Sequence, residues 1–534
     1  MSANTSADEQ LVSGSAVRRV IDALRGNRLA GVALAFVLGL VGLGGWALSS
    51  PVGSEPDSDF HLASIWCTTA DPGSPCDMEE RRNQKMVPAA LIDARCYSHD
   101  RDASAACQPL MTTADGRETM TNRLNIVESQ SGYPAGFYIF NNTLAGENID
   151  TSVFTMRMIN VVLFLGIGAA LWLLLPVRLR NAMTWAWAVT IVPLGVFVIA
   201  STNPSSWALI GVGYSWVALL GYLEAEGYRR WVLGVFFLLT VGMAAASRTD
   251  ATLFAIATAG VALLASDAPA KQLVKRLWIP AVGAVLAIAV LFFQRGAIGV
   301  LLKGFMRDRE VVDWERLWFN FIEIPALWMG VFGGWPFGAL GWLDTPMPQL
   351  VGFLSFGAFV AVFGIAVTSS TWRVRAMTAL MIAMLWVYPL FILQQADELV
   401  GLVFQSRYAL PLVPVLIGIA LLRPAGHGGI LPNPTHRLWI VGALSIANAV
   451  ALHQNIRRYV TGYDSFGYNL NNSEWWWFGL RESWLTPMAV WYLGSLAFFG
   501  FLWVVLMWGA DHVINNSPAR KNTSPRLIRP RDIR

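Results

Sequence analysis

Long apolar runs separated by short polar connectors dominate the sequence. A transmembrane α-helix needs about 20 predominantly apolar residues, and the first such run covers residues 29–49. Further runs that we predict to span a membrane cover residues 153–175, 182–200, 207–223, 231–246, 251–266, 277–294, 349–368, 376–394, 408–422, 438–453 and 485–508. The pattern predicts an all-α polytopic membrane protein with about 12 transmembrane helices. The runs lack the residue-by-residue alternation of apolar and polar side chains that is typical of the strands of a membrane β-barrel.

The polar segments divide the chain further. Residues 50–152 form the longest polar stretch, too long for a plain connector, so we expect a small subdomain there. The other expected parts are a basic N-terminus (1–28), transmembrane helices two to seven (153–294), a loop (295–348), helices eight to twelve (349–508) and a basic tail (509–534). Within the loop, residues 324–342 are apolar and rich in Gly and Pro, which is typical of a re-entrant or interfacial segment.

Charge refines the topology. Charged residues make up 14% of the chain, against about 25% in a typical soluble protein. Lys and Arg occur in alternate connectors and in both terminal segments. Since positive loops favour the cytoplasm, we predict a multi-pass protein of the cell membrane with both termini cytoplasmic and residues 50–152 outside. The net charge of +4 indicates contact with membrane lipids and does not indicate nucleic-acid binding.

All cysteines lie in the expected extracytoplasmic segment, at Cys67, Cys76, Cys96 and Cys107. Their intervals do not match CxxC-type zinc sites. Cysteines confined to one loop are typical of disulfides on the oxidising side of a membrane. Three pairings are possible, and we expect the one between sequence neighbours, Cys67 with Cys76 and Cys96 with Cys107.

An acidic segment directly follows the first predicted span and contains Asp57, Asp59 and His61. A carboxylate there could take a proton from an acceptor hydroxyl. The spacing of the two aspartates could instead hold Mg or Mn. A third interpretation is that Asp57 or Ser58 caps a short helix. His61 could orient an aspartate, donate to a phosphate, or be structural.

Arginines at the expected outer ends of the spans could bind a phosphate, because the guanidinium group forms bidentate contacts with anionic oxygens. The candidates are Arg248, Arg295 and Arg407. The alternative is that these side chains snorkel to lipid headgroups. Trp475 could stack on a sugar or belong to an interfacial aromatic belt.

Four short segments resemble a bacterial family of multi-pass membrane proteins known as domain of unknown function 2142. Residues 56–61 (PDSDFH) resemble its P-D-E-x-x-H segment, and 203–205 (NPS) its N-P-S turn. Residues 341–348 (GWLDTPMP) resemble its GWLD segment, and 405–411 (QSRYALP) its Q-G-R-Y-x-x-P segment. The last two add Asp344 and Tyr408 to the candidate residues.

This family is similar in layout to the GT-C superfamily of polyprenyl-phosphate-sugar-dependent glycosyltransferases. The resemblance implies that Asp57 is the catalytic base. Ser58 stands where the family often has Glu, so Asp59 remains an alternative. The cysteine pattern resembles an actinobacterial branch in which decaprenyl-phosphate sugars are the expected donors.

We therefore expect a glycosyltransferase that moves a sugar from a polyprenyl-phosphate donor to a cell-envelope glycan or lipid acceptor on the outer face. The alternatives are a transporter or flippase and a non-catalytic assembly partner for lipid-linked glycans. The spans carry few acidic residues at mid-depth, which disfavours ion-coupled transport. Nucleotide-binding loops of the P-loop type are absent from the sequence.

Overall fold

The computed structural model describes residues 26–68, 76, 85–108, 117–121, 123, 133–293, 313–401, 404–424, 432–473, 476–477 and 484–509. Arg295 and Trp475, and most of the two terminal segments, lie outside the described residues. The helices of the bundle are α2 (Arg28–Leu48), α6 (Ile149–Leu174), α7 (Val177–Ala188), α8 (Leu194–Ile199), α9 (Ser205–Glu224), α10 (Gly227–Ser247), α11 (Thr249–Ala265), α12 (Ala270–Arg276), α13 (Trp278–Phe293), α15 (Trp314–Val331), α16 (Gln349–Thr368), α17 (Trp372–Ala396), α18 (Ser406–Ala409), α19 (Leu412–Ala420), α20 (Pro434–Val460), α22 (Pro487–Leu502) and the π-helical η2 (Trp503–Trp508).

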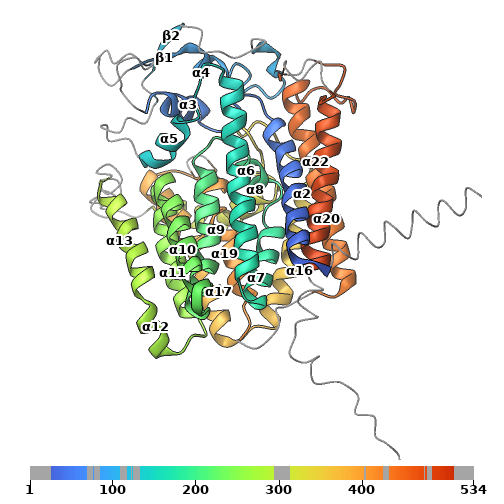
Figure 1. Cartoon of the computed structure of the whole chain (residues 1–534). Helices are drawn as coiled ribbons and strands as arrows, with labels where there is room; N and C mark the ends of the chain where they lie inside the picture. The colour runs from blue at the N-terminus through green and yellow to red at the C-terminus, as the bar shows by residue number, and fades with distance from the viewer. Residues whose placement is uncertain are drawn as a thin grey trace, which may run out of the picture.

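The long helices run side by side, and a small subdomain covers one end of the bundle (Figure 1). That subdomain contains α3 (Ser58–Trp66), β1 (Lys85–Pro88), α4 (Ala89–Asp93), the short η1 (Ala105–Cys107), β2 (Glu118–Thr121) and α5 (Ala135–Asn142). We call this end of the bundle the loop end. The other end, where α12 lies, is the opposite end (Figure 1).

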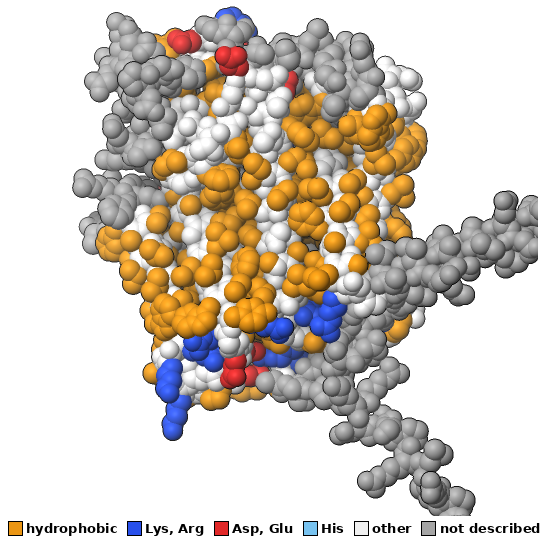
Figure 2. Space-filling model, in the orientation of Figure 1, with side chains coloured by type: hydrophobic (Ala, Val, Ile, Leu, Met, Phe, Trp, Pro, Cys, Tyr) orange, Lys and Arg blue, Asp and Glu red, His pale blue; other side chains and the backbone are white. Residues whose placement is uncertain are grey.

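Eight helices in the described part of the chain are long and apolar enough to cross a membrane, or up to nine if the bent pair α12–α13 counts as one span. They are α2, α6, α9, α10, α16, α17, α20 and α22 with η2. Hydrophobic side chains cover the middle of the face drawn in Figure 2, as expected for a lipid-facing surface. The protein is therefore a multi-pass helical membrane protein, and the count of about 12 spans stays a prediction.

Prolines explain why two predicted spans are interrupted. The run 182–200 contains the end of α7 and all of α8, with Pro193 between them. The run 408–422 is divided into α18 and α19 at Pro411. Proline has no backbone N–H and clashes with the preceding helical turn. The expected re-entrant segment 324–342 consists of the second part of α15 followed by irregular backbone.

Helix α9 forms the centre of the bundle. Its spanning window is entirely buried, while α10 and α11 pack along it. A helix that is apolar on all sides is typical of such a central position. At Gly211, an added Cβ would lie 2.6 Å from the Thr240 carbonyl oxygen of α10. Glycine therefore permits the close approach of these two helices.

The loop-end subdomain is held together by a two-stranded antiparallel sheet and two disulfides. The sheet pairs Lys85 with Thr121 and Pro88 with Glu118. The disulfides join Cys67 to Cys76 and Cys96 to Cys107. The predicted pairing between sequence neighbours is confirmed. The two crosslinks anchor the segments that directly follow α3 and α4.

Candidate functional site

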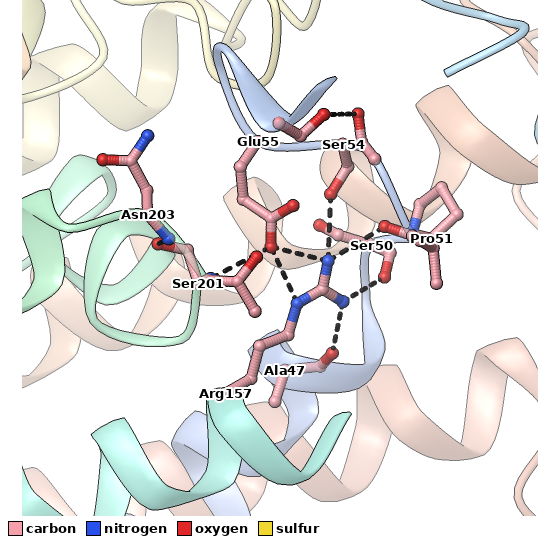
Figure 3. A network of polar contacts seen from close by, with 12 residues as sticks. Ala47, Ser50, Pro51, Ser54, Glu55, Arg157, Ser201 and Asn203 are labelled. Atoms are coloured by element: carbon pink, nitrogen blue, oxygen red, sulfur yellow. Dashed lines mark hydrogen bonds and ion pairs between the residues drawn. The ribbon is translucent and has the colours of Figure 1, made fainter. Parts of the chain in front are cut away.

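A buried ion pair shapes the turn that precedes Asp57. Glu55 and Arg157, on α6, are 2% and 0% exposed, and their nearest charged atoms lie 2.7 Å apart. Figure 3 shows the Arg157 guanidinium surrounded by this turn. It donates to the carbonyl oxygens of Ala47, Ser50 and Pro51 at 2.5–3.1 Å and to Ser54 Oγ at 3.3 Å. Arg157 thus fixes the path of the chain from the end of α2 to Asp57.

The same network joins this turn to the Asn-Pro-Ser turn between α8 and α9. The Thr202 backbone N–H donates to Glu55 Oε1 at 3.3 Å. Asn203 Nδ2 donates to the Pro56 carbonyl at 2.9 Å, and its side chain lies beside the network in Figure 3. The Trp342 indole of the GWLD segment donates to the Gly53 carbonyl at 2.9 Å. The NPS and GWLD segments are thus each hydrogen-bonded to residues 53–56, the turn that leads into Asp57.

Asp57 sits at the start of α3 in the left-handed region, with φ 58° and ψ 26°. Its carboxylate makes no helix-capping hydrogen bond. Instead, Oδ2 accepts from Arg407 Nη2 at 2.7 Å and Oδ1 lies 3.4 Å from Arg123 Nη2. The side chain is 37% exposed. Asp57 therefore combines a charged partner with access to a ligand.

Asp59 has a different environment, although it lies two residues away. Its side chain is 2% exposed and faces the loop-end subdomain. Oδ2 lies 2.9 Å from Arg95 Nη1 and 3.4 Å from Arg123 Nε. A buried carboxylate held in this way is typical of a structural ion pair. Arg123 bridges the two aspartates.

Arg407 is buried, and two of its nitrogens are not satisfied. Nη2 donates to Asp57 and, at 2.9 Å, to Tyr408 Oη. Nε and Nη1 have no hydrogen-bond partner among the described residues. Buried N–H groups of a charged side chain are costly when unpaired. This arginine therefore has two donors available for an anionic ligand.

Arg248 lies on the other side of Tyr408. Its guanidinium is 4.4 Å from the Tyr408 ring centroid and forms a bidentate pair with Asp250 at 2.9 and 2.7 Å. Nη1 also lies 3.4 Å from Ser205 Oγ. The structure thus brings Arg248, Tyr408, Arg407 and Asp57 together as one chain of contacts.

All four segments line one crevice beside Arg407. The crevice is narrow: its interior has room for about one water molecule, ≈ 20 Å³, within ≈ 430 Å³ of empty space that includes open solvent. The residues from the four segments are Pro56, Asn203, Ser205, Gly341, Leu343, Gln405, Ser406 and Arg407. The rest of the lining comes from Ser201, from apolar side chains of α8, including Leu194 and Phe197, and from Phe337, Ala339 and Leu340. The crevice therefore combines apolar walls with several neutral polar groups and the cation of Arg407.

The pKa of Asp57 reflects two opposing effects. Burial raises it, but attraction to Arg407, the hydrogen bond from that residue, and the weaker effects of His61 and Arg123 leave it below 3.8. The carboxylate is therefore ionised at neutral pH. Its ion pair with Arg407 is present above about pH 4 and is lost as the pH falls through the lowered pKa of Asp57.

His61 is buried within the electrostatic reach of Asp57. Its Nδ1 is 2.9 Å from Tyr138 Oη, and its ring packs edge-on against Tyr133. Burial lowers the pKa of His61 from 6.5 to about 3, despite the opposing attraction of Asp57. The imidazole is therefore neutral at physiological pH. His61 is placed to orient α3 and α5 near the site.

The low pKa of His61 predicts a pH-dependent stability. Between pH 6.5 and about 3 the unfolded chain binds a proton that the folded chain does not, so stability should fall as the pH falls through this window. We expect His61→Gln to flatten the dependence of the melting temperature on pH there. The exposed His436→Gln variant is the control. Equal slopes for wild type and His61→Gln would contradict the burial of a neutral imidazole.

A family model described as predicted membrane protein (DUF2142) matches residues 19–416. The chain belongs to this family. No curated protein and no solved structure matches the chain. The DUF2142 match covers the loop-end subdomain and all four segments that line the crevice.

Asp344, which the sequence analysis of this DUF2142 protein also named as a candidate, lies in a separate ion pair with Arg458. Asp344 is 7% exposed and accepts from the fully buried Arg458 at 2.8 Å. Arg458 also donates to the carbonyls of Tyr97, Asp100 and Ala103. This pair ties the GWLD segment to α20 and to the subdomain, which is a structural connection.

The aspartate pair is a poor match for a metal ion. Asp57 and Asp59 face different guanidinium groups, and Arg123 lies against both. A divalent cation there would be repelled by these arginines and would have to break their ion pairs. Within the described residues, no three His, Cys, Asp or Glu side chains gather as ligands. The alternative that the two aspartates hold Mg or Mn therefore has no fitting donor set among the described residues.

Sequence reasoning missed four residues of the site: Glu55, Arg157, Arg95 and Arg123. One signal was present, because Arg157 is the sole charged residue in the apolar run 153–175. A charge inside such a run usually has a partner and a role. Its partner Glu55 lies within the acidic segment, 102 positions from Arg157. The arginines from the subdomain gave no comparable signal, since charged residues are common in polar loops.

Proposed function

We propose that this DUF2142 protein is a membrane glycosyltransferase. It would transfer a sugar from a polyprenyl-phosphate donor to a cell-envelope glycan or lipid acceptor on the extracytoplasmic face. The observation that carries the proposal is that four distant segments line one crevice, and that Arg407 in its lining has unpaired donors and is paired with the accessible carboxylate of Asp57. An isoprenoid chain suits the apolar walls and its phosphate suits Arg407.

In the proposed reaction, the acceptor hydroxyl attacks the anomeric carbon of the donor. The new glycosidic C–O bond forms while the bond from that carbon to the phosphate oxygen breaks. The hydroxyl proton passes to the Asp57 carboxylate, which acts as general base. The electron pair of the broken bond stays on the polyprenyl phosphate, whose added charge Arg407 and Arg248 stabilise.

Exposure and pairing favour Asp57 over Asp59 as the base. Asp57 is 37% exposed, whereas Asp59 is buried against Arg95 and Arg123. A general base must come within hydrogen-bond reach of the proton that it takes. Asp59 instead fits a positioning role, because it fixes Arg123 beside Asp57.

Donor binding would also activate the base. In the free protein Arg407 holds the pKa of Asp57 low, which makes the carboxylate a weak base. A donor phosphate would compete for the Arg407 guanidinium and loosen its contact with Asp57. The pKa of Asp57 would then rise, so that the base becomes stronger when the donor is in place.

Arg407→Gln is expected to weaken donor binding by about 30-fold or more, because the buried guanidinium is the main cation of the crevice. The measurement is the apparent KM for a labelled polyprenyl-phosphate sugar in membranes. Arg101→Gln changes an exposed arginine of the subdomain and is the matched control. An unchanged KM for Arg407→Gln would remove this residue from the donor site. Tight donor binding by the wild type without turnover would favour a non-catalytic assembly partner.

A further inference from the structure

A second cationic pocket lies at the opposite end of the bundle. It has a volume of ≈ 340 Å³ and lies between the end of α9, the start of α10 and the helices α12 and α13. Its lining consists of Tyr222, Arg230, Pro269, Lys271, Gln272, Lys275, Arg276 and Trp278. Figure 2 shows Lys and Arg side chains gathered at this end of the molecule. The lining contains four cations and no acidic residue.

Two residues of this lining, Arg276 and Gln272, stabilise the packing of the helices. Arg276 is buried and donates to the carbonyls of Leu223 and Ala225 at 2.6 and 2.9 Å. Gln272 Nε2 donates to the Leu223 carbonyl at 3.0 Å. These contacts satisfy the carboxyl end of α9 and fix α12 against it. Lys271 and Lys275 are exposed on α12.

Two buried polar atoms at the pocket remain unpaired. Tyr222 is fully buried, yet its hydroxyl has no hydrogen-bond partner among the described residues. Arg230 Nε is also buried and has no hydrogen-bond partner among the described residues. Leaving such groups unsatisfied is unfavourable, and both can donate to an anionic oxygen. They provide an indication of a ligand that is independent of the surface lysines.

We propose that this pocket binds the phosphate of an anionic lipid headgroup. Lys271, Lys275 and Arg230 supply the positive charge, and the Tyr222 hydroxyl donates to a phosphate oxygen. Exposed Trp231 and Trp278 flank the pocket with ring centroids 5.8 Å apart. Exposed tryptophans are typical of the membrane–water interface, where headgroups lie, and basic pockets between membrane helices bind anionic headgroups. This proposal is independent of the glycosyltransferase proposal.

The test measures lipid binding by native mass spectrometry of the purified, detergent-solubilised full chain. We expect phosphatidylglycerol to bind more tightly than phosphatidylcholine. Lys271→Gln with Lys275→Gln should weaken phosphatidylglycerol binding by about 10- to 30-fold. Tyr222→Phe should weaken it by about 2- to 10-fold, since it removes one hydrogen-bond donor.

The control is Arg229→Gln with Arg375→Gln, which removes two exposed cations at the same end but outside the pocket. Its affinity for phosphatidylglycerol should stay within about twofold of the wild-type value. The proposal is overturned if the Lys271/Lys275 variant binds like the wild type, or if the control loses as much affinity. Pyrophosphate binding that exceeds lipid binding, and is lost in the Lys271/Lys275 variant, would overturn the lipid assignment in favour of a soluble phosphate.

Discussion

Asp57→Asn is expected to reduce sugar transfer by about 10²- to 10⁴-fold, the usual contribution of a positioned general base. The amide has nearly the same shape but cannot accept the acceptor's proton. Donor binding should be retained, because the change frees Arg407 from its carboxylate partner. The loss of stability should be about 1 kcal/mol or less, since Asp57 is more than one-third exposed. The measurement is transfer from a labelled polyprenyl-phosphate sugar in membranes.

Two variants make this result interpretable. Asp93→Asn is the same chemical change at an exposed position on α4, and it should transfer sugar at the wild-type rate. Asp59→Asn should lower the melting temperature more than Asp57→Asn, because it weakens two ion pairs of a buried carboxylate. Full activity in Asp57→Asn would remove this residue as the base. Full activity in both aspartate variants would remove the acidic segment from the mechanism.

Arg157→Leu should cost about 3–5 kcal/mol of stability, which is typical when one partner of a buried ion pair is removed. The leucine would leave the Glu55 carboxylate buried without its cation, as well as the carbonyls of the turn that Arg157 binds. Because this turn leads into Asp57, sugar transfer should fall together with stability. The measurement is thermal unfolding of the detergent-solubilised protein.

A second substitution shows how much of the stability loss in Arg157→Leu comes from the unpaired Glu55 carboxylate. Glu55→Gln added to Arg157→Leu removes the uncompensated carboxylate and should recover part of the lost stability. Recovery should be incomplete, since four other acceptors of Arg157 remain unpaired. Arg101→Leu, at an exposed site of the subdomain, should change stability little. A melting temperature of Arg157→Leu equal to that of the wild type would contradict a structural role for this pair.

Much of the membrane architecture could be predicted from the sequence, because hydrophobic length and charge are local properties. Every predicted span falls on a helix or on a pair of short helices. Two predicted spans are interrupted at Pro193 and Pro411, as the chemistry of proline explains. Apolar composition alone did not indicate these interruptions. The disulfide pairing was open among three possibilities, and the short intervals favoured the one that the structure contains.

Several residues of the site were predicted from the sequence, but the contacts between them were not. The sequence indicated Asp57, Arg407, Arg248 and Tyr408 as separate candidates, and the structure brings them into contact. The contrast between the exposed Asp57 and the buried Asp59 depends on arginines about 40 and 60 residues away in the subdomain. Such long-range contacts depend on how the rest of the subdomain packs on α3, which no local pattern encodes.

The position of a bound donor decides whether the crevice beside Arg407 holds a lipid-linked sugar. The measurement is a cryo-electron microscopy structure of Asp57→Asn with a polyprenyl-phosphate sugar, since this variant should bind without turnover. We expect the phosphate within hydrogen-bond distance of Arg407 Nε or Nη1, with the isoprenoid chain along Leu194 and Phe197. A donor bound elsewhere, with Arg407 still facing residue 57 alone, would contradict it.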